Sequence, residues 1–423
     1  MNENFLAFVW KHRLYDLPLF TIDGKPIEVL SPGIENLDAG PDFFNARVRI
    51  EKMIWVGNVE IHTKASDWYL HNHQRDPSFN NTVLHVVYDS NRDVMTKVGY
   101  VVPQLELKGF LAESPMVCYR RMMETLHWIP CEYGIRDVDR FLIEKMLESC
   151  LLERLANRGE AIEELLTRWK GDWMQVFFIL LSRAFGTRVN AMAFELMAQA
   201  TPVTLMLKNA HNLTTLEALL FGQAGMLSSQ YRESYPSTLY REYAYMKHKY
   251  GLTTIPYSCW KFMRIRPSGF PTIRIAQLAA FFHKNYHQIA RFFNAPSLPL
   301  LQEAFSLKAS PYWNNHVKFG EKVKGRSARS LGKSTVNTLL INAVIPLSFV
   351  YLKHTHPAKA DIIPDLLYQL PPEDNGIIRK WNQLVPKASS AAHTQAVIQL
   401  KKSYCEVKKC LRCLIGHAVL TAN

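Results

Sequence analysis

The spacing of the apolar residues changes once along this chain of 423 residues, and that change restricts the folds it can adopt. Up to about residue 110, apolar and polar residues alternate within short runs, as at 46–50, which is typical of β-strands with one buried face. From about residue 135 the apolar residues recur every three or four positions, as at 141–155, which is typical of α-helices. The chain is therefore predicted to have an α+β fold, in which an N-terminal mixed sheet is followed by a large all-α region.

Turn and cap signals divide these two parts into elements. In the first part we expect a helix at 2–14, strands at 19–22, 27–30, 46–50 and 53–64, a helix-compatible stretch at 66–81, and strands at 83–88 and 98–107. Asp23-Gly24 is a favourable hairpin turn, and Gly57-Asn58 indicates a bulge. Asp172 is expected to cap a helix that ends at Gly186, and further helices are expected at 189–200, 213–228, 272–293, 335–353 and 391–403.

The length and charge of the chain limit its organisation and its partners. So long a chain exceeds one ordinary hydrophobic core, and we expect a sheet domain at 1–110, a helical region at 111–390, and a C-terminal helix with a cysteine cluster at 391–423. The chain has 50 Lys and Arg against 37 Asp and Glu, which gives a net charge of +13. This balance favours a polyanionic partner, and we expect it to be nucleic acid.

No segment is expected to cross a membrane. The longest apolar runs, 174–181 and 341–352, are shorter than the roughly 20 residues required, and Pro346 is expected to break the second. The first residues have neither the basic start nor the cleavage site of a signal peptide. The chain has seven cysteines, which is an odd number, and they are unevenly spaced along the sequence. This pattern indicates reduced thiols and not a set of disulfides. A cytoplasmic location is therefore predicted.

Two carboxylates are the strongest candidates for chemistry. Asp42 follows Gly40-Pro41 at the start of one expected strand, and Glu60 lies late in the next strand, so the two side chains should be neighbours. Because strand side chains alternate, His62 and Lys64 should share the face of Glu60. Two adjacent carboxylates repel each other unless a cation lies between them, and Mg²⁺ is the expected cation.

The segment that carries this pair resembles the core of the PD-(D/E)xK nucleases over residues 2–88. Asp42 matches the aspartate that follows proline in their motif, and Glu60 matches the second acid. His62 stands where lysine is usual, which puts catalysis in question. The resemblance implies Asp42, Glu60, His62 and Lys64 as catalytic residues. The alternative is that Asp42 caps a turn and Glu60 pairs with Arg47 or Arg49.

Several histidines follow the acidic pair. His71-Asn72-His73, together with Asp76 and His85, offers ligands for a transition metal, although His71 and His73 would point apart on a helix. The favoured interpretation is that His71, His73 and Arg75 line the mouth of the site and contact phosphate. His85 lies within an apolar strand and is expected to be an ordinary core residue.

A second set of metal-binding residues lies near the C-terminus. Cys405, Cys410 and Cys413 fall within nine residues and are flanked by lysines, which we expect to lower the thiol pKa. They could bind Zn²⁺ or an iron–sulfur cluster, as in some helicase-associated PD-(D/E)xK nucleases that this arrangement resembles. The fourth ligand could be His417, Cys118, Cys131 or Cys150. The alternative is a set of reduced thiols packed on a short helix.

Basic residues in the helical part are candidates for nucleic-acid contacts. Arginines lie among aromatic residues at 264–274, and the loop at 318–334 is rich in Lys and Arg, although such a charge run is often only a solvated surface. The candidate nucleic-acid-binding residues here are Arg264, Arg266, Arg274, Lys322, Lys324 and Arg326. Gly332-Lys333-Ser334 is not a Walker phosphate loop, because Ser327 occupies the position of the required glycine.

Seven stretches together resemble an uncharacterised bacterial family that is catalogued only as a domain of unknown function. They are 40–42, 57–62, 67–68, 84–87, 221–225, 264–277 and 405–416. That resemblance implies no activity, so the expected function depends on the residues. We expect metal-dependent cleavage of DNA or RNA. The alternatives are a non-catalytic nucleic-acid-binding or scaffold protein that kept the fold, and a cysteine–metal structural protein without nucleic acid.

Overall fold

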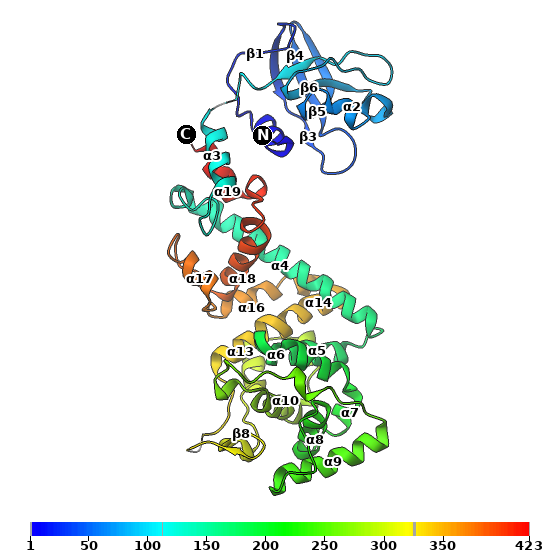
Figure 1. Ribbon diagram of the computed structural model, residues 1–423, viewed down its shortest axis with the longest axis vertical. Coiled ribbons are helices and arrows are strands. Elements are labelled where there is room, and N and C mark those ends of the chain that lie inside the picture. Colours follow the sequence, from blue (N-terminus) through cyan, green and yellow to red (C-terminus); the bar gives the residue numbers. More distant parts are fainter. Residues whose placement is uncertain (1, 112, 325–326, 423) are drawn as a thin grey trace. The chain divides into compact units, whose positions relative to one another are not determined.

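The computed structural model describes residues 2–111, 113–324 and 327–422, and it contains two compact units (Figure 1). The first comprises Met1–Leu147 and Leu400–Asn423, and the second comprises Glu148–Gln399. The two ends of the chain therefore belong to one unit. The division differs from the boundaries expected at residues 110 and 390, because residues 111–147 and the C-terminal segment make their contacts within the first unit.

A mixed sheet forms the N-terminal part of the first unit. Its strands follow the order β1-β2-β4-β5-β6-β7, with β3 paired to β4. Pairing is antiparallel from β1 to β5, whereas β5, β6 and β7 run parallel. The strands are β1 (Leu19–Phe20), β2 (Pro26–Ser31), β3 (Ile34–Glu35), β4 (Phe43–Ile50), β5 (Met53–Lys64), β6 (Thr82–Asp89) and β7 (Gln104–Glu106). The hairpin expected at Asp23-Gly24 joins β1 to β2.

The sheet buries both of its faces along residues 57–62 of β5. Helix α1 (Glu3–His12) packs its apolar side, including Phe5 and Trp10, against the face that carries Val59 and Ile61. Side chains of a strand alternate, so Glu60 and His62 point to the opposite face. That face is covered by Trp68 and Phe79, which belong to a second apolar cluster. The predicted bulge is confirmed by a register shift between Asn58 and Val59 in the β5–β6 pairing.

Short helical turns replace the single helical stretch expected at 66–81. They are the α-helix α2 (Asp67–Leu70) and the 3-10 helices η1 (His73–Arg75) and η2 (Pro77–Phe79). Asn72 separates the first two with a left-handed backbone, φ 63°. Asn tolerates this conformation better than most residues do. The chain therefore reverses direction between His71 and His73 and does not continue one helix.

The remainder of the first unit is helical. It includes α3 (Glu113–Glu124), the 3-10 turns η3 (Ile135–Asp137) and η9 (Cys410–Arg412), the π-helical turn Lys401–Cys405, and α19 (Leu414–Thr421). The long helix α4 (Arg140–Arg168) begins here, and the Asp139 carboxylate accepts the Phe141 N–H at its start. A Cβ atom on Gly134 would meet Val419 at 2.8 Å, so this glycine lets the chain before α4 pack closely against α19.

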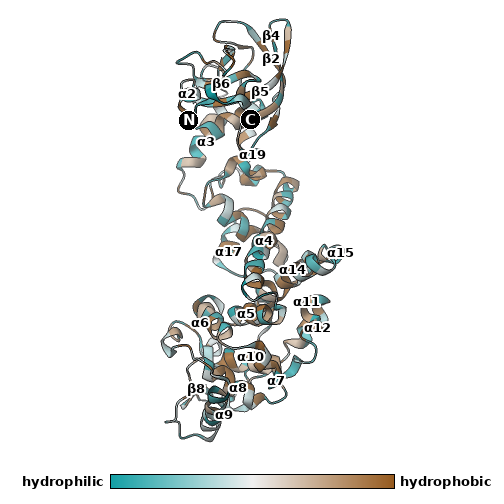
Figure 2. Ribbon diagram, turned by 90° about the vertical axis from the view of Figure 1, so that its right-hand side faces the viewer, coloured by the Kyte–Doolittle hydropathy of each residue, from teal (hydrophilic) through white to brown (hydrophobic). Residues whose placement is uncertain are grey.

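The second unit consists mainly of helices. They are α5 (Trp173–Phe185), α6 (Thr187–Gln199), α7 (Val203–Lys208), α8 (Leu213–Gln223), α9 (Ser234–Tyr250), α10 (Pro271–Asn285), α11 (Arg291–Asn294), α12 (Leu298–Ala304), α13 (Lys333–Leu339), α14 (Ile345–Thr355), α15 (Pro357–Ala360), α16 (Ile363–Gln369), α17 (Gly376–Trp381) and α18 (Ala391–Leu400). Helices α5 and α10 are largely hydrophobic and form part of its core (Figure 2). Asp172 caps α5 as predicted, accepting the N–H groups of Met174 and Gln175. A small hairpin, β8 (His316–Lys318) and β9 (Glu321–Lys322), occupies part of the expected basic loop.

Pro346 does not break the apolar segment in which it lies. Residues Lys333–Thr355 form one continuous helix with a π-helical turn at Leu340–Val344, just before the proline. A proline has no N–H, and widening the preceding turn accommodates it. The Arg158 guanidinium donates to the carbonyl of Ile341 and to the side chain of Asn342 there. This helix is long and apolar enough to cross a membrane, yet 61% of its most apolar window is buried within the protein, as in a core helix.

Candidate metal centre in the N-terminal sheet

Asp42 and Glu60 lie side by side and hold each other through the backbone. The Asp42 N–H donates to Glu60 Oε2 at 3.1 Å, and the Ile61 N–H donates to Asp42 Oδ2 at 2.8 Å. The pairing of Phe43 with Val59 in β4 and β5 sets this position. Glu60 makes no ion pair with Arg47 or Arg49 among the described contacts, and Arg49 instead pairs with Glu28.

Burial changes the protonation of both carboxyl groups. Burial and, to a smaller extent, the neighbouring Glu60 carboxylate raise the pKa of Asp42 to about 7. Burial likewise raises the pKa of Glu60 to about 8, and the N–H from Asp42 opposes that rise. Two adjacent acids that are largely removed from water favour a bound cation, because the cation replaces the protons that otherwise neutralise them.

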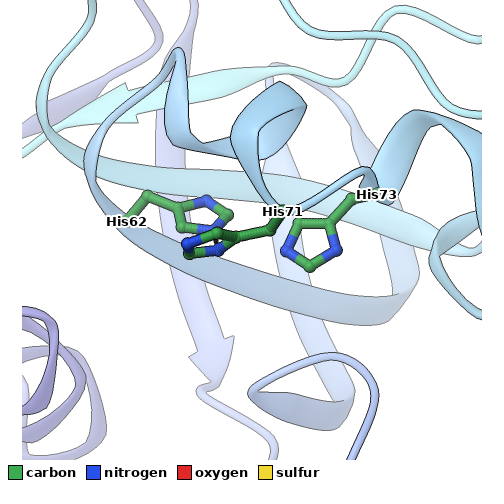
Figure 3. A group of neighbouring side chains, drawn as sticks. All are labelled: His62, His71 and His73. Atoms are coloured by element: carbon green, nitrogen blue, oxygen red, sulfur yellow. Dashed lines mark hydrogen bonds between the residues drawn. The ribbon is translucent and has the colours of Figure 1, made fainter.

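Three histidines complete the site. Ligand nitrogens of His62, His71 and His73 all lie within 4.8 Å of one another, and Figure 3 shows the three rings gathered beside the sheet. His73 Nε2 lies 3.1 Å from Glu60 Oε1, and His62 Nε2 lies 3.6 Å from the same oxygen. The left-handed Asn72 is what turns both loop histidines toward His62. On the helix considered for this segment the two histidines would point apart, and a shared metal was therefore not the favoured interpretation.

His85 supports the site from the next strand. Its Nε2 lies 2.8 Å from His62 Nδ1, because Glu60 and His85 are register partners in the parallel β5–β6 pair. Burial lowers the pKa of His62 to about 2 and that of His85 to about 3, so both rings are neutral. A neutral His62 that donates from Nδ1 to His85 keeps the lone pair of Nε2 for the site. His85 is fully buried, as expected of a core histidine, and it also contacts His62.

His73 offers a ligand nitrogen that has no hydrogen-bond partner. Its Nε2 is buried and makes no hydrogen bond of acceptable geometry, although Glu60 Oε1 is only 3.1 Å away. The ring is held by stacking on Phe79, with centroids 3.8 Å apart, and by an edge contact with Trp68. Buried polar atoms in proteins normally have partners, so this nitrogen is prepared for a group that binds there.

Glu3 is a nearby residue that the sequence analysis missed. It lies in the first turn of α1, and its charge raises the pKa values of both Asp42 and Glu60. The helix itself was predicted, but an acid in a first helical turn is common and carried no separate signal. Glu3 adds a third carboxylate to the environment of the site.

Other predicted residues lie at the edge of the site or outside it. His71 is exposed and opens the cluster to solvent. The side chains of Lys64 and Arg75 are also exposed. Asp76 caps η2 by accepting the Ser78 N–H, so it serves the backbone of the loop.

The basic candidates in the second unit fall into two classes. Arg264, Arg266 and Lys324 are exposed, and Lys322 is exposed beside Glu233, with their charged atoms 3.7 Å apart. Arg274 is largely buried and donates to Gln277 and Thr335, so it stabilises the fold. Arg326 lies outside the described residues.

The sequence of the chain places it in a family. A family model described as Protein of unknown function (DUF2851) matches residues 3–376. The chain belongs to this family. No curated protein and no solved structure matches the chain. The family match ends before the C-terminal cysteines and assigns no activity, so functional inference depends on the geometry.

Proposed function

We propose that the chain is a metal-dependent hydrolase that cleaves phosphodiester bonds of nucleic acid at the Asp42–Glu60 site. The observation that carries the proposal is the convergence of the buried Glu60 and the partly buried Asp42 with three imidazoles on one face of the sheet. Structural packing alone rarely brings together so many titratable groups that are removed from water, because each loses hydration energy.

The spacing of the donor atoms suits a transition metal. Tetrahedral bonds of about 2.1 Å to nitrogen and oxygen place two ligand atoms about 3.4 Å apart. Glu60 Oε1 lies 3.1 Å from His73 Nε2 and 3.6 Å from His62 Nε2. His71 Nδ1 lies 3.1 Å from His62 Nε2. Glu60, His62 and His73 would hold the metal, with His71 or Asp42 beside it.

The chemistry of these donors favours a metal other than the expected Mg²⁺. Magnesium prefers an all-oxygen octahedral shell, whereas imidazole suits iron, nickel, copper and zinc better. We therefore propose a divalent transition metal, and magnesium is the comparison in the test. Such a metal, when bound, would polarise a phosphodiester and lower the pKa of a bound water. Glu60 and the histidines would position it, and His71 is the exposed member of this group.

The topology of the sheet adds support. A helix is followed by an antiparallel meander of β2, β4 and β5, then by helical turns and the parallel strand β6. This is the αβββαβ order of the PD-(D/E)xK nucleases that residues 2–88 resemble. His62 stands in the lysine position and is neutral, so in this proposal the charge that lysine would offer comes from the metal.

Nucleic acid is the proposed substrate because the net charge of the chain is +13 and exposed basic residues lie on the second unit. If about six phosphates are neutralised, affinity falls roughly a thousandfold between 50 and 200 mM salt. Fluorescence anisotropy with labelled DNA and RNA measures this dependence. An affinity that does not change with salt would contradict a polyanionic substrate.

The decisive assay measures cleavage of labelled single- and double-stranded DNA and RNA with Mn²⁺, Zn²⁺ or Mg²⁺. We expect cleavage with a transition metal, and we expect Glu60→Gln and Asp42→Asn to abolish it. Glu28→Gln is the matched control, because Glu28 is an exposed carboxylate of the same sheet that pairs with Arg49. Cleavage that survives in Glu60→Gln would contradict the proposal.

A second candidate is a nucleic-acid-binding protein that has lost the chemistry. The observation in its favour is the neutral, buried His62 in the lysine position. Salt-sensitive binding of nucleic acid without cleavage in any of these metals would select this candidate.

A further inference from the structure

A second group of metal-binding side chains lies in the first unit, away from the sheet site in sequence and in chemistry. The thiols of Cys131, Cys405, Cys410 and Cys413 interact electrostatically in every one of their pairwise combinations. Cys131, Cys410 and Cys413 are buried, with 5–7% of each residue exposed. No disulfide joins them among the described cysteines.

The backbone around Cys410 and Cys413 forms a tight turn, and N–H groups that follow it point at a sulfur atom. The Cys413 N–H donates to the Cys410 carbonyl at 3.2 Å, which closes a tight turn between the two cysteines. The N–H groups of Ile415 and Gly416 point at the Cys413 sulfur. A Cβ atom on Gly416 would lie 2.4 Å from the Cys410 carbonyl oxygen, so only glycine fits there. N–H groups directed at a sulfur stabilise a thiolate, which is the form that binds metal.

Cys131 is the fourth thiol of the group, because the loop that carries it packs on the C-terminal segment that carries the other three cysteines. Lys401 lies over the Trp128 ring, and Gly134 contacts Val419. The other candidates have different partners. Cys118 lies 2.7 Å from the Tyr133 hydroxyl, and the His417 ring lies against His12. Cys150 belongs to the second unit.

The structure corrects the expected effect of the flanking lysines. Burial and, to a smaller extent, the neighbouring thiol of Cys413 raise the pKa of Cys410 to about 12. Lys408 lowers it by less. Burial also raises the pKa of Cys131, Cys405 and Cys413. The lysines therefore do not produce free thiolates, and the thiols need a different cation close to the sulfurs.

We propose that Cys131, Cys405, Cys410 and Cys413 bind one metal centre through four thiolates and so join the two ends of the chain within the first unit. Four cysteines form the usual ligand set of a structural Zn²⁺ and of an iron–sulfur cluster. The shared chemistry is tetrathiolate coordination, and the experiment separates the two metals. The proposal is independent of the nuclease proposal, because none of the four thiols belongs to the sheet site.

The distances between the sulfur atoms also distinguish a single zinc ion from an iron–sulfur cluster. A single Zn²⁺ with bonds of about 2.3 Å places its sulfurs about 3.8 Å apart. Among the described residues, the four sulfurs do not form a group with mutual distances within 4.8 Å, as the three histidines do. A zinc ion would therefore draw the sulfurs together, whereas a cluster of several iron atoms spans a wider set.

The test uses the full chain, purified without oxygen from cells supplied with both zinc and iron. Metal and acid-labile sulfide are measured per chain, and absorption near 400 nm identifies an iron–sulfur cluster. Metal-stripped protein is also loaded with Co²⁺, because a thiolate–cobalt charge-transfer band reports sulfur ligands and is not produced by the histidine site. The variants are Cys131→Ser and Cys410→Ser, and the matched control is Cys118→Ser.

Beyond any metal at the sheet site, we expect about one cysteine-bound metal centre per wild-type chain and a cobalt–thiolate band whose intensity corresponds to four sulfurs. Cys131→Ser and Cys410→Ser should each lose at least nine-tenths of this centre and of the band, whereas Cys118→Ser should keep both. Zinc that these two variants lose, without sulfide, identifies a single ion, and iron with sulfide identifies a cluster. Wild-type protein without the cobalt–thiolate band and without a sulfide-containing cluster would overturn the proposal, whatever metal the sheet site holds. That measurement uses wild-type protein, so it stays decisive even if one of the variants fails to fold.

Discussion

The histidine–carboxylate site and the cysteine cluster, both in the first unit, are built in opposite ways. The proposed ligands of the first lie within residues 42–73 on adjacent strands and one loop, and strand register holds them together. The proposed ligands of the second come from residue 131 and from residues 405–413, and only tertiary packing brings them together. This difference teaches that the sheet alone positions the side chains of the first site, whereas at the second a bound metal would connect segments that are distant in sequence. Metal at the first should therefore serve chemistry, and metal at the second should serve stability.

The largest expected effect separates chemistry from stability. Glu60→Gln should reduce metal-dependent cleavage at least a thousandfold, equivalent to about 4 kcal/mol in activation free energy. The melting temperature should change little, because the glutamine carbonyl can still accept the Asp42 N–H. Parallel cleavage assays and thermal melts measure both effects. A variant that unfolds but cleaves normally when folded would reverse the assignment of the two sites.

The next effect concerns the cysteines. Cys410→Ala and Cys413→Ala should each reduce the free energy of unfolding by about 4 kcal/mol or more, since one missing ligand empties the centre. The double variant should lose little more than either single variant. Denaturant titrations of all three, with Cys118→Ala as control, give the coupling free energy. Independently packed thiols would instead show additive losses of about 1 kcal/mol each.

A buried carboxylate in the second unit supplies a contrast with Glu60. Burial raises the pKa of Glu217 to about 7, and no clustered acid or histidine accompanies it among the causes. Its protonated form is favoured in the folded state, so its stabilising contribution is complete below pH 4.5 and is lost as pH rises to 7. The loss should reach about 3 kcal/mol. Chemical denaturation across this pH range should show that slope, and Glu217→Gln should remove it. An unchanged slope in Glu217→Gln would show that other groups cause it.

The smallest effect concerns two exposed lysines, one in the β8–β9 hairpin and one just after it. Reversal of Lys322 and Lys324 to glutamate should weaken nucleic-acid binding by about tenfold and reduce its salt dependence, if each lysine neutralises one phosphate. Arg274 is the informative comparison, because it is largely buried, and its replacement should affect stability and not the salt dependence. Anisotropy titrations at several salt concentrations distinguish the two outcomes. Equal affinity for wild-type protein and the double lysine variant would remove this hairpin from the binding surface.

Much of the fold could be predicted from local sequence patterns. The periodicity of apolar residues predicted α1, the antiparallel strands β2, β4 and β5, and β6. The contact between Asp42 and Glu60 was predicted because the two residues were placed on adjacent strands. These features depend on residues close in sequence. The strand expected at 98–107 is limited to Gln104–Glu106, because the chain before it pairs Met95 with Val101 in an isolated bridge.

What the sequence did not reveal depends on backbone geometry or long-range packing. The convergence of His71 and His73 requires the left-handed Asn72, a conformation that no periodicity encodes. The choice of Cys131 among the candidate ligands requires knowing which loop packs on α19. The continuous helix through Pro346 depends on a π-helical turn that the distant Arg158 stabilises.

The central claim is that Glu60, His62 and His73 hold one divalent metal in the sheet. Calorimetric titration of chelator-treated protein with Mn²⁺ tests it most directly, since manganese prefers nitrogen and oxygen donors to thiolates and so does not report the cysteines. We predict about one Mn²⁺ site per chain, lost in Glu60→Gln and in His73→Ala and unchanged in His127→Ala, which replaces an exposed histidine of the same unit. Identical isotherms for wild-type protein, Glu60→Gln and His73→Ala would contradict the account.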